Sequence, residues 1–462
     1  MPAHPVIDPA FRTAALDVPS ALAFALAFAV VAFLTRRDAA YGVALLVASV
    51  PFDFSRALGP TTVTLPKVAL LAVALGLALA RAPLGVLRGR AALALGAAGA
   101  AVLVATAISI ASADHRGPAL RETFKALDYL ALFAVVVVAT RARYDEPLVR
   151  TVLTGSVALV AVLALVQEVA GAPSGMWFAG RPIPRIAGPL EGPNQLSGYL
   201  GIALCALTAF ALARRPRGFE RLALGLGSAA LVLTVSRAAI PATLAGIAVV
   251  TALSPRRPLR VLAVPVAAGA AAGVAVLGAW GYANAHGFAG LDVLGRFSTL
   301  AESEQAGTVG KRSQLWRAAV TLWRSHPWLG IGAGNFELEL GRAGFPGLRT
   351  HANSLYLQSL AEGGLPLFAA ALASLLAPIV RLRNRAAADP VIAAAVGATA
   401  GLALHQAFDF LAFYPKVGDL WWIVLGLGAA RYDAVADASV GSEAVGDAEP
   451  AAARGPTAAY ER

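Results

Sequence analysis

Basic and polar side chains gather in four short segments that separate long apolar runs. These are Arg181–Arg185 followed by Glu191 and Asn194, then Ser236–Arg237, then Lys311–Arg312, and finally His351–Ser354. Guanidinium groups suit phosphate ligands, because each donates hydrogen bonds in a planar fork and keeps its charge. A neutral imidazole beside them could accept a proton. Together these residue types predict a site for a phosphate or pyrophosphate group.

The composition indicates what must hold these segments in place. Of the 462 residues, 58% are apolar and only 14% are charged, against about 25% charged in a typical soluble domain. Polar surface is too scarce to cover a water-soluble particle, which excludes a soluble enzyme, a disordered chain and a fibrous repeat. The sequence therefore predicts an all-α, polytopic membrane helix bundle, since lipid offers no partner to backbone polar groups.

Apolar runs of helical length recur along the chain and predict about 12 transmembrane helices. We expect about ten N-terminal transmembrane helices over 1–280, a periplasmic loop over 281–353, C-terminal transmembrane helices over 354–431, and a disordered cytoplasmic tail over 432–462. Within the loop, residues 313–325 predict an amphipathic helix, because apolar side chains recur there at helical spacing. Such a helix could lie in the membrane interface or pack on the bundle.

Five connections between the apolar runs are rich in arginine. They occur at every second connection along the chain, so all five lie on the same face of the membrane. They contain Arg81, Arg88 and Arg90; Arg141, Arg143 and Arg150; Arg214, Arg215, Arg217 and Arg221; Arg256, Arg257 and Arg260; and Arg381, Arg383 and Arg385. The positive-inside rule makes the face that they share cytoplasmic. The net charge of +11 is then explained by membrane topology, so we expect no nucleic-acid partner.

The same alternation places all four polar segments on the opposite, periplasmic face. Arg237 has apolar neighbours on both sides, and a charge at membrane depth is costly without a partner. Arg181 could instead extend to lipid headgroups, as arginines at span ends commonly do. His351 precedes a long apolar run, so a helix N-terminus would lower its pKa and leave it mostly neutral at pH 7. It could also serve only as a hydrogen bonder at the helix start.

Three other features receive simpler interpretations. The remaining histidines have no ligand-like spacing, so we expect no metal site and no cofactor. The Gly330–Ile–Gly332–Ala–Gly334 run lacks a surrounding strand–helix unit, which favours a tight turn over a nucleotide loop. Asp409 and Asp419 could pair with the outer arginines, but we expect ordinary charges at span ends.

The ordered set of motifs resembles the O-antigen ligase and polymerase superfamily of bacterial inner-membrane glycosyltransferases. The matching pieces are Arg185–Ile–Ala–Gly188 with Pro193–Asn194, Thr234–Val–Ser236–Arg237–Ala238, Arg312–Ser–Gln–Leu–Trp316, His326–Pro327–Trp328 through Asn335–Phe336, and His351 through Gly364–Leu–Pro. Many relatives carry a second His followed by Asn where this chain has Asn353 and Ser354. The resemblance covers about 185 to 366; the N-terminal spans match only as generic membrane helices.

This resemblance implies a GT-C-like, metal-independent and inverting glycosyltransferase of the bacterial inner membrane, with its active site facing the periplasm. The implied donor is a glycan on undecaprenyl pyrophosphate, and the implied acceptor is a sugar hydroxyl of lipid A–core, both presented among membrane lipids. The implied catalytic residues are His351, Arg237 and Arg185. Further substrate-binding candidates are Glu191, Asn194, Arg312, Arg181 and Asn353.

Alternative functions remain open from the sequence. No residue separates a ligase from a polymerase of lipid-linked polysaccharide repeat units, and a protein-glycosylating ligase is a third member of the same class. A lipid or glycan transporter would favour ionisable residues at mid-bilayer and inverted repeats. Here the charges gather at span ends and on one outer face, which favours the transferase.

Overall fold

The computed structural model describes residues 14–52, 54–58, 61–169, 177–178, 181–182, 185–254, 266–267, 269–275, 312–411 and 414–446. Its helices are α1 (Val18–Arg37), α2 (Ala39–Ser49), α3 (Leu65–Leu79), α4 (Arg90–Ile108), α5 (Arg116–Ala142), α6 (Glu146–Val169), α7 (Pro193–Ala213), α8 (Gly218–Leu233), α9 (Ala239–Leu253), α12 (Arg312–Ser325), α13 (Phe336–Glu339), α14 (Leu355–Leu382), α15 (Pro390–His405) and α16 (Pro415–Gly446). Two hairpins join them, β1 (Ser55–Leu58) with β2 (Thr61–Thr64), and β3 (Trp177–Phe178) with β4 (Arg181–Pro182).

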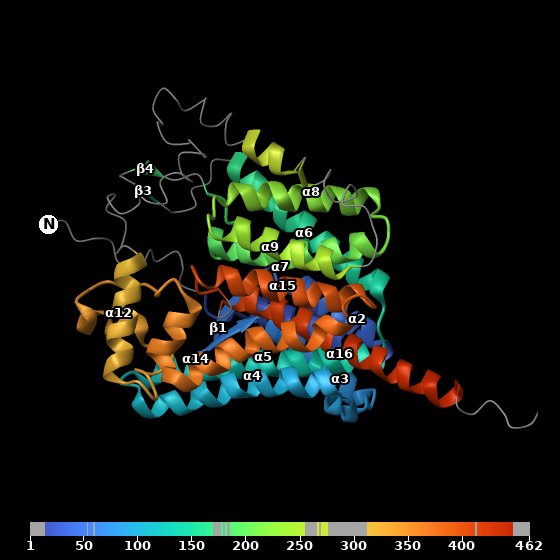
Figure 1. Ribbon diagram of the computed structural model, residues 1–462, viewed down its shortest axis with the longest axis horizontal. Helices are drawn as coiled ribbons and strands as arrows, with labels where there is room; N and C mark the ends of the chain where they lie inside the picture. The colour runs from blue at the N-terminus through green and yellow to red at the C-terminus, as the bar shows by residue number, and fades with distance from the viewer. Residues whose placement is uncertain are drawn as a thin grey trace, which may run out of the picture.

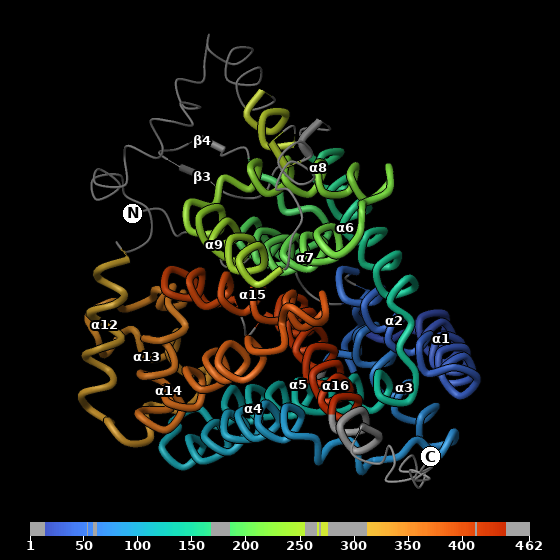
Figure 2. The backbone as a smooth tube through the Cα atoms, turned by 45° about the vertical axis from the view of Figure 1, so that its right-hand side comes forward, coloured from blue at the N-terminus to red at the C-terminus, as the bar shows by residue number. Residues whose placement is uncertain are grey.

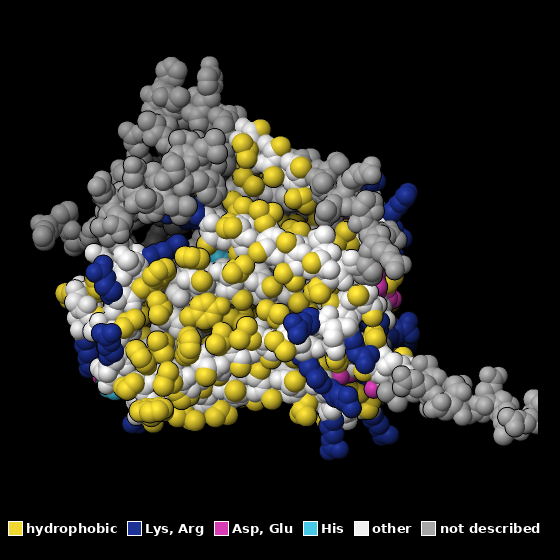
Figure 3. Space-filling model, in the orientation of Figure 1, with side chains coloured by type: hydrophobic (Ala, Val, Ile, Leu, Met, Phe, Trp, Pro, Cys, Tyr) yellow, Lys and Arg dark blue, Asp and Glu magenta, His cyan; other side chains and the backbone are white. Residues whose placement is uncertain are grey.

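The long helices run side by side along one axis of the molecule (Figure 1). Six of the described helices are long and apolar enough to cross a membrane, and four more apolar helices are shorter, namely α2, α3, α9 and α15. Hydrophobic side chains cover the middle of the face shown in Figure 3, and Lys and Arg side chains lie toward its two ends. The protein is therefore an all-α, multi-pass membrane protein, as predicted, although the expected number of about 12 spans is not established.

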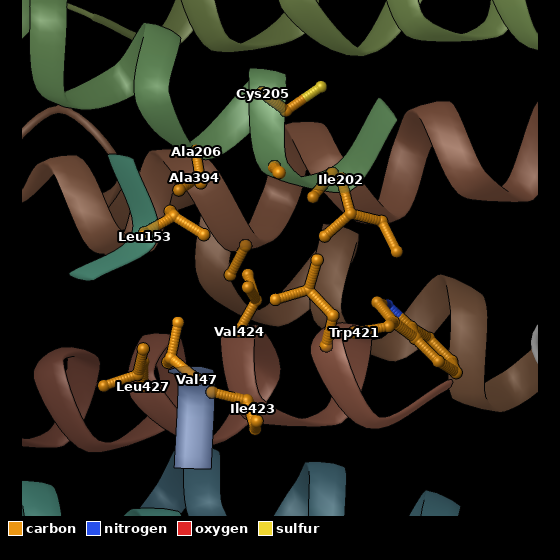
Figure 4. Close-up of a cluster of buried hydrophobic side chains, with 14 of the residues drawn as sticks. Val47, Leu153, Ile202, Cys205, Ala206, Ala394, Trp421, Ile423, Val424 and Leu427 are labelled. Carbon is orange, nitrogen blue, oxygen red and sulfur yellow. The ribbon is translucent and has the colours of Figure 1, made fainter. Parts of the chain in front are cut away.

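The bundle is built as adjoining helix groups around a common apolar core. Helix α15 packs against α7 and α9, while α16 packs against α5 and α14 against α4 (Figures 1 and 2). Small residues bring these helices close together: the Gly246 backbone on α9 approaches the Gly397 and Gly401 backbones on α15, the kind of contact that favours helix association in membranes. Figure 4 shows Ile202 and Cys205 of α7 above Trp421, Val424 and Leu427 of α16.

Ion pairs join the predicted cytoplasmic connections at one end of the bundle. Arg150 on α6 pairs with Glu220 on α8, and Arg214 after α7 lies 3.9 Å from Glu146 on α6. Other pairs at this end are Arg141 with Asp437, Arg143 with Asp38, and Arg431 with Asp389. The arginine-rich connections among the described residues therefore meet at one end, as the alternating spans require. The connection with Arg256, Arg257 and Arg260 lies outside the described residues.

The final helix extends beyond the point where the sequence predicted a tail. We expected disorder from residue 432, but α16 continues to Gly446. The Asp433 carboxylate accepts hydrogen bonds from the Ala91 and Ala92 backbone N–H groups, at 2.9 and 3.1 Å. It thereby caps the start of α4 from a neighbouring helix, since the first N–H groups of a helix lack partners within it. Residues 447–462 lie outside the described range.

Helix α12 forms where the amphipathic pattern predicted it. Leu315, Ala319 and Leu322 are buried together with Ala318, and they pack in a small second core with Phe336 and Leu340. Figure 2 shows α12, α13 and α14 side by side at the left edge of the bundle, away from α2, α3 and the C-terminal end of the chain. The apolar stripe therefore packs on protein. Residues 281–311, the first part of the expected periplasmic loop, lie outside the described residues.

This arrangement predicts the sidedness of the two ends. The chain's one cysteine, Cys205, is buried and should not react. Both Arg317 on α12 and Arg215 after α7 are exposed. In intact inner-membrane spheroplasts, a membrane-impermeant maleimide should label Arg317→Cys but label Arg215→Cys only after permeabilisation, as gel mobility would show. The reverse pattern would invert the topology, and the parent protein serves as the unlabelled control.

Candidate functional site

Arg185 connects three segments at the outer end of the bundle. Its Nε donates a hydrogen bond to the Thr234 carbonyl at 2.6 Å, and its Nη2 donates one to Asn194 Oδ1 at 2.8 Å. Asn194 lies in the first turn of α7, and Thr234 begins the turn between α8 and α9. This guanidinium therefore fixes the loop before α7 against the turn that carries Arg237.

The α8–α9 turn has a strained backbone. Val235 adopts a φ of 50°, a left-handed conformation that is an outlier for a β-branched residue. The Ser236 N–H donates to Thr234 Oγ1 at 3.3 Å, and Ser236 is buried. Strain of this kind persists only where surrounding contacts impose it, and it concentrates at functional sites. The turn presents Arg237 directly before α9 begins.

Arg237 and Arg312 form the rest of a cationic cluster, which we call the outer arginine cluster together with Arg185. Burial lowers the pKa of the half-buried Arg237 guanidinium, and the positive charge of Arg312 lowers it further. Arg312 is exposed at the first residue of α12. Neither Arg237 nor Arg312 forms an ion pair with an acidic side chain in the described part of the chain. The two like charges therefore repel each other.

Asp409 is the acidic group that the cluster faces. It is buried, and its Oδ1 accepts a hydrogen bond from the Phe410 N–H at 2.9 Å. Burial raises the pKa of its carboxyl, whereas the charges of Arg312 and Arg185 lower it. Asp409 is therefore coupled to the outer arginines, and the expectation of an ordinary span-end charge is wrong. The sequence allowed this pairing only as the less favoured alternative, because the contact depends on how α15 packs.

His351 lies in an aromatic and acidic environment just before α14. Its ring centroid lies 5.2 Å from that of Phe410 and 5.8 Å from that of Tyr414, the latter edge-on. Burial is the main cause that lowers its pKa, with a smaller lowering from Lys125, while Glu337 raises it. The pKa of the imidazole is therefore lowered mainly by burial, a cause that differs from the expected helix N-terminus.

The segment between α15 and α16 joins the imidazole to the outer arginine cluster. The Leu355 N–H, four residues after His351, donates to the carbonyls of Gln406 and Asp409, each at 2.9 Å. Tyr414 meets His351 on one side and forms a side-chain hydrogen bond with Gln195, the neighbour of Asn194, on the other. Burial raises the pKa of Tyr414 to about 12, so its hydroxyl stays protonated. The segment therefore places His351 and the arginines at one end of the bundle.

The remaining predicted site residues take different positions. The exposed Glu191 lies 3.5 Å from Lys416 Nζ, and Lys416 also donates to the Pro189 carbonyl at 2.8 Å. Asn194 holds Arg185, as described above. Asn353 has a φ of 52°, and its Nδ2 donates to the His351 carbonyl at 3.3 Å. Arg181 belongs to β4, but its side chain lies outside the described residues, as does Lys311. Lys416 was not singled out in the sequence analysis.

The glycine-rich run that ends at Gly334 is hydrogen-bonded to the Ala361–Leu365 part of α14. The Ile331 and Gly332 N–H groups donate to the carbonyls of Ala361 and Glu362, at 2.9 and 2.8 Å, and the Leu365 N–H donates to the Pro327 carbonyl. Helix α14 is broken at Gly364, which has a φ of 62° and a ψ of −156°. A Cβ at Gly364 would lie 2.4 Å from the Trp328 carbonyl oxygen. The predicted tight turn is thus a docking segment for the kink in α14.

The described residues contain no group of three or more His, Cys, Asp or Glu side chains that could hold a metal ion. The donors that do converge at the outer end are guanidinium groups, one carboxylate and an imidazole. Such a set can bind an anion and move a proton near it.

Residues 222–372 match the family model described as O-Antigen ligase. This segment contains the α8–α9 turn with Arg237, helix α12 with Arg312, the glycine-rich run and His351; Arg185 lies outside it. The match covers about a third of the chain, and over these residues it supports the resemblance inferred from the motifs. Members of the family are glycosyltransferase-like enzymes of glycan assembly. No curated protein matches the chain.

The docking of the glycine-rich run on α14 makes a prediction about Gly364→Ala. A side chain there meets both a left-handed φ and the Trp328 carbonyl, so the free energy of unfolding should fall by more than the roughly 1–3 kcal/mol of backbone strain alone. The matched control is Gly344→Ala, at a φ of 93° with nothing within 4 Å of the added Cβ. Thermal unfolding in detergent should show the larger loss for Gly364→Ala; equal losses would contradict the close approach.

Proposed function

We propose that this protein is an O-antigen ligase, transferring a glycan from undecaprenyl pyrophosphate to a sugar hydroxyl of lipid A–core at the periplasmic face of the inner membrane. The observation that carries the proposal is the tie from Arg185 to Asn194 and to the turn of Arg237. It assembles cationic groups at the end of the bundle opposite the arginine-rich connections, where a lipid-linked donor would present its pyrophosphate.

The outer arginine cluster would bind the pyrophosphate of the donor. Arg237 and Arg312 lie close enough to repel each other electrostatically, and a dianionic ligand between them would remove that repulsion. The cluster also sits where α9 begins, and helix N-termini add backbone donors and a positive dipole end. Fixed donors of this kind stabilise charge that grows on a leaving group, a role that a divalent cation fills in other enzymes.

His351 would act on the acceptor. The acceptor oxygen attacks the anomeric carbon of the donor sugar, and its proton passes to the neutral imidazole as the new C–O bond forms. The bond from the anomeric carbon to the pyrophosphate oxygen breaks, and undecaprenyl pyrophosphate departs with the electron pair against the arginines. Attack from the face opposite the leaving group inverts the anomeric configuration. The proposed reaction requires no metal and no cofactor.

Glu191, Asn194 and Asn353 would contribute in different ways. Asn194 holds Arg185 in place, and Asn353 holds the backbone of His351. Glu191, exposed beside Lys416, and Arg181 would contact the sugar chain. A polymerase of lipid-linked repeat units is the alternative function. It would use the same groups, with a lipid-linked repeat unit as the acceptor.

Purified protein in detergent, given a glycan on undecaprenyl pyrophosphate, should glycosylate lipid A–core and retain activity in excess chelator. Transfer only to a second lipid-linked repeat unit would identify a polymerase instead. Activity that a chelator abolishes and Mg²⁺ restores would contradict the metal-free reaction. The products separate by gel electrophoresis and mass spectrometry.

Arg237→Ala should lower kcat by about 10²–10³, because it removes one preorganised donor from the leaving group, while the melting temperature stays unchanged. The control is Arg324→Ala, which removes an exposed arginine from the far end of α12. Equal activity of the two variants would remove Arg237 from the site. The assay is initial-rate transfer with a donor titration.

His351→Ala should lower kcat by about 10²–10⁴, the usual contribution of a well-placed general base, with little change in donor affinity. Because burial lowers the pKa of His351, wild-type activity should decline on the acid side at a lower pH than the roughly 6.5 at which an unperturbed imidazole gains its proton. His326→Ala, at an exposed histidine on the same side, is the control. An unchanged kcat in His351→Ala would assign the base elsewhere.

A further inference from the structure

A carboxylate that the sequence analysis did not single out lies against the His351 imidazole. Glu337 Oε1 is 3.2 Å from His351 Nδ1, and each side chain is about one-third exposed, at 36% and 34%. Among the described residues, Nδ1 has no partner that completes a hydrogen bond with it. Pairs of this kind are often poorly aligned before substrate binds and tighten afterwards.

We propose that Glu337 is the positioning residue for His351, holding the imidazole with its proton on Nδ1 so that Nε2 faces the acceptor hydroxyl. This inference rests on the proposed function, since it assigns a partner to the proposed base. The chemistry is that of a carboxylate–imidazole pair, in which the acid fixes the tautomer and stabilises the imidazolium that forms.

The backbone around Glu337 is fixed by contacts on both sides. The Phe336 N–H donates to Glu362 Oε1 at 3.2 Å, and Arg349 Nη1 donates to the Glu337 carbonyl at 3.0 Å. Asn335, fully buried, exchanges hydrogen bonds with the His115 backbone, at 3.1 Å each. A side chain on so constrained a turn can hold an imidazole within a narrow range of orientations, as a supporting residue must.

Other charged groups also face His351, but none is as well placed. Glu122 and Lys125 on α5 act on it with opposite signs, since Glu122 raises its pKa and Lys125 lowers it. They also form an ion pair of their own, with Lys125 Nζ at 2.6 Å from Glu122 Oε1. Tyr414 approaches edge-on and stays protonated. Glu337 is therefore the carboxylate free to act on Nδ1.

Two aromatic rings pack against the His351 imidazole, which Glu337 approaches at Nδ1. Phe410 and Tyr414 pack against His351 at tilted and perpendicular angles, which limits rotation of the imidazole. Phe410 also follows Asp409, the carboxylate that faces the outer arginine cluster. A ring held between this segment and Glu337 is oriented relative to the arginines.

The test compares Glu337→Gln, Glu337→Asp and the control Glu339→Gln. Glu339 lies two residues further on, where its carboxylate faces His115 and Arg342. Glu337→Gln should lower kcat by about 10–100-fold, the size of effect that follows removal of the carboxylate behind a metal-bound imidazole. Since Glu337 raises the pKa of His351, the acid limb of the kcat/KM profile should also move to lower pH. Glu337→Asp should keep the limb near its wild-type position, and Glu339→Gln should leave the rate and the profile unchanged.

Suppose that His351→Ala inactivates the enzyme but Glu337→Gln changes neither the rate nor the acid limb. That result would overturn the role of Glu337 and leave the proposed function intact. An active His351→Ala enzyme would overturn the proposed base itself. A lower rate in Glu337→Gln could also come from a loss of stability, so a second measurement is made without substrate. It is ¹⁵N NMR of histidine-labelled protein, in which the His351 signal is assigned by its loss in His351→Ala. The wild type should show the Nδ1–H tautomer, and Glu337→Gln a mixture of both; the same tautomer in both proteins would contradict the proposal.

Discussion

Like charges held together at the edge of a membrane constrain the rest of this structure. Arg237 and Arg312 repel each other, and the low dielectric of the bilayer makes such repulsion costly. Hydrogen bonds and one nearby carboxylate hold these charges in place. Arg185 ties the loop before α7 to the α8–α9 turn, and the buried Asp409 supplies one negative charge beside the cluster. A bound anion would neutralise the remaining positive charge of the cluster.

The support comes from segments that are far apart in the chain. The 405–414 segment accepts hydrogen bonds from the start of α14, orders the aromatic rings around His351 and carries Asp409. The Pro327–Gly334 run docks on the broken helix α14 and thereby sets the position of α13 with Glu337. The outer end behaves as one assembly, in which the arginines, the imidazole and its carboxylate depend on the same few backbone contacts.

Patterning and residue chemistry anticipated much of this arrangement. The apolar runs and the arginine-rich connections predicted a helical membrane bundle with its polar segments gathered at one end, because both depend on local composition. Arg185, Arg237 and His351 could be proposed from charge at helix ends. The pairing of Asp409 with the arginines was only one of two interpretations, and Glu337 was not recognised, since both depend on tertiary contacts with Arg312 and His351. The extension of α16 was missed for the same reason: the Asp433 cap on α4 leaves no trace in local composition.

The break at Gly364 divides α14 into two parts that differ in length and polarity. After Gly364 the helix runs over 365–382, about 27 Å at 1.5 Å per residue, close to the roughly 30 Å of hydrocarbon in a bilayer. The stub before it, bearing the buried Gln358 and Glu362 joined at 2.8 Å, can then lie at headgroup depth. One left-handed glycine thus separates a stretch that matches the thickness of a bilayer from a short polar turn that docks on the Pro327–Gly334 run.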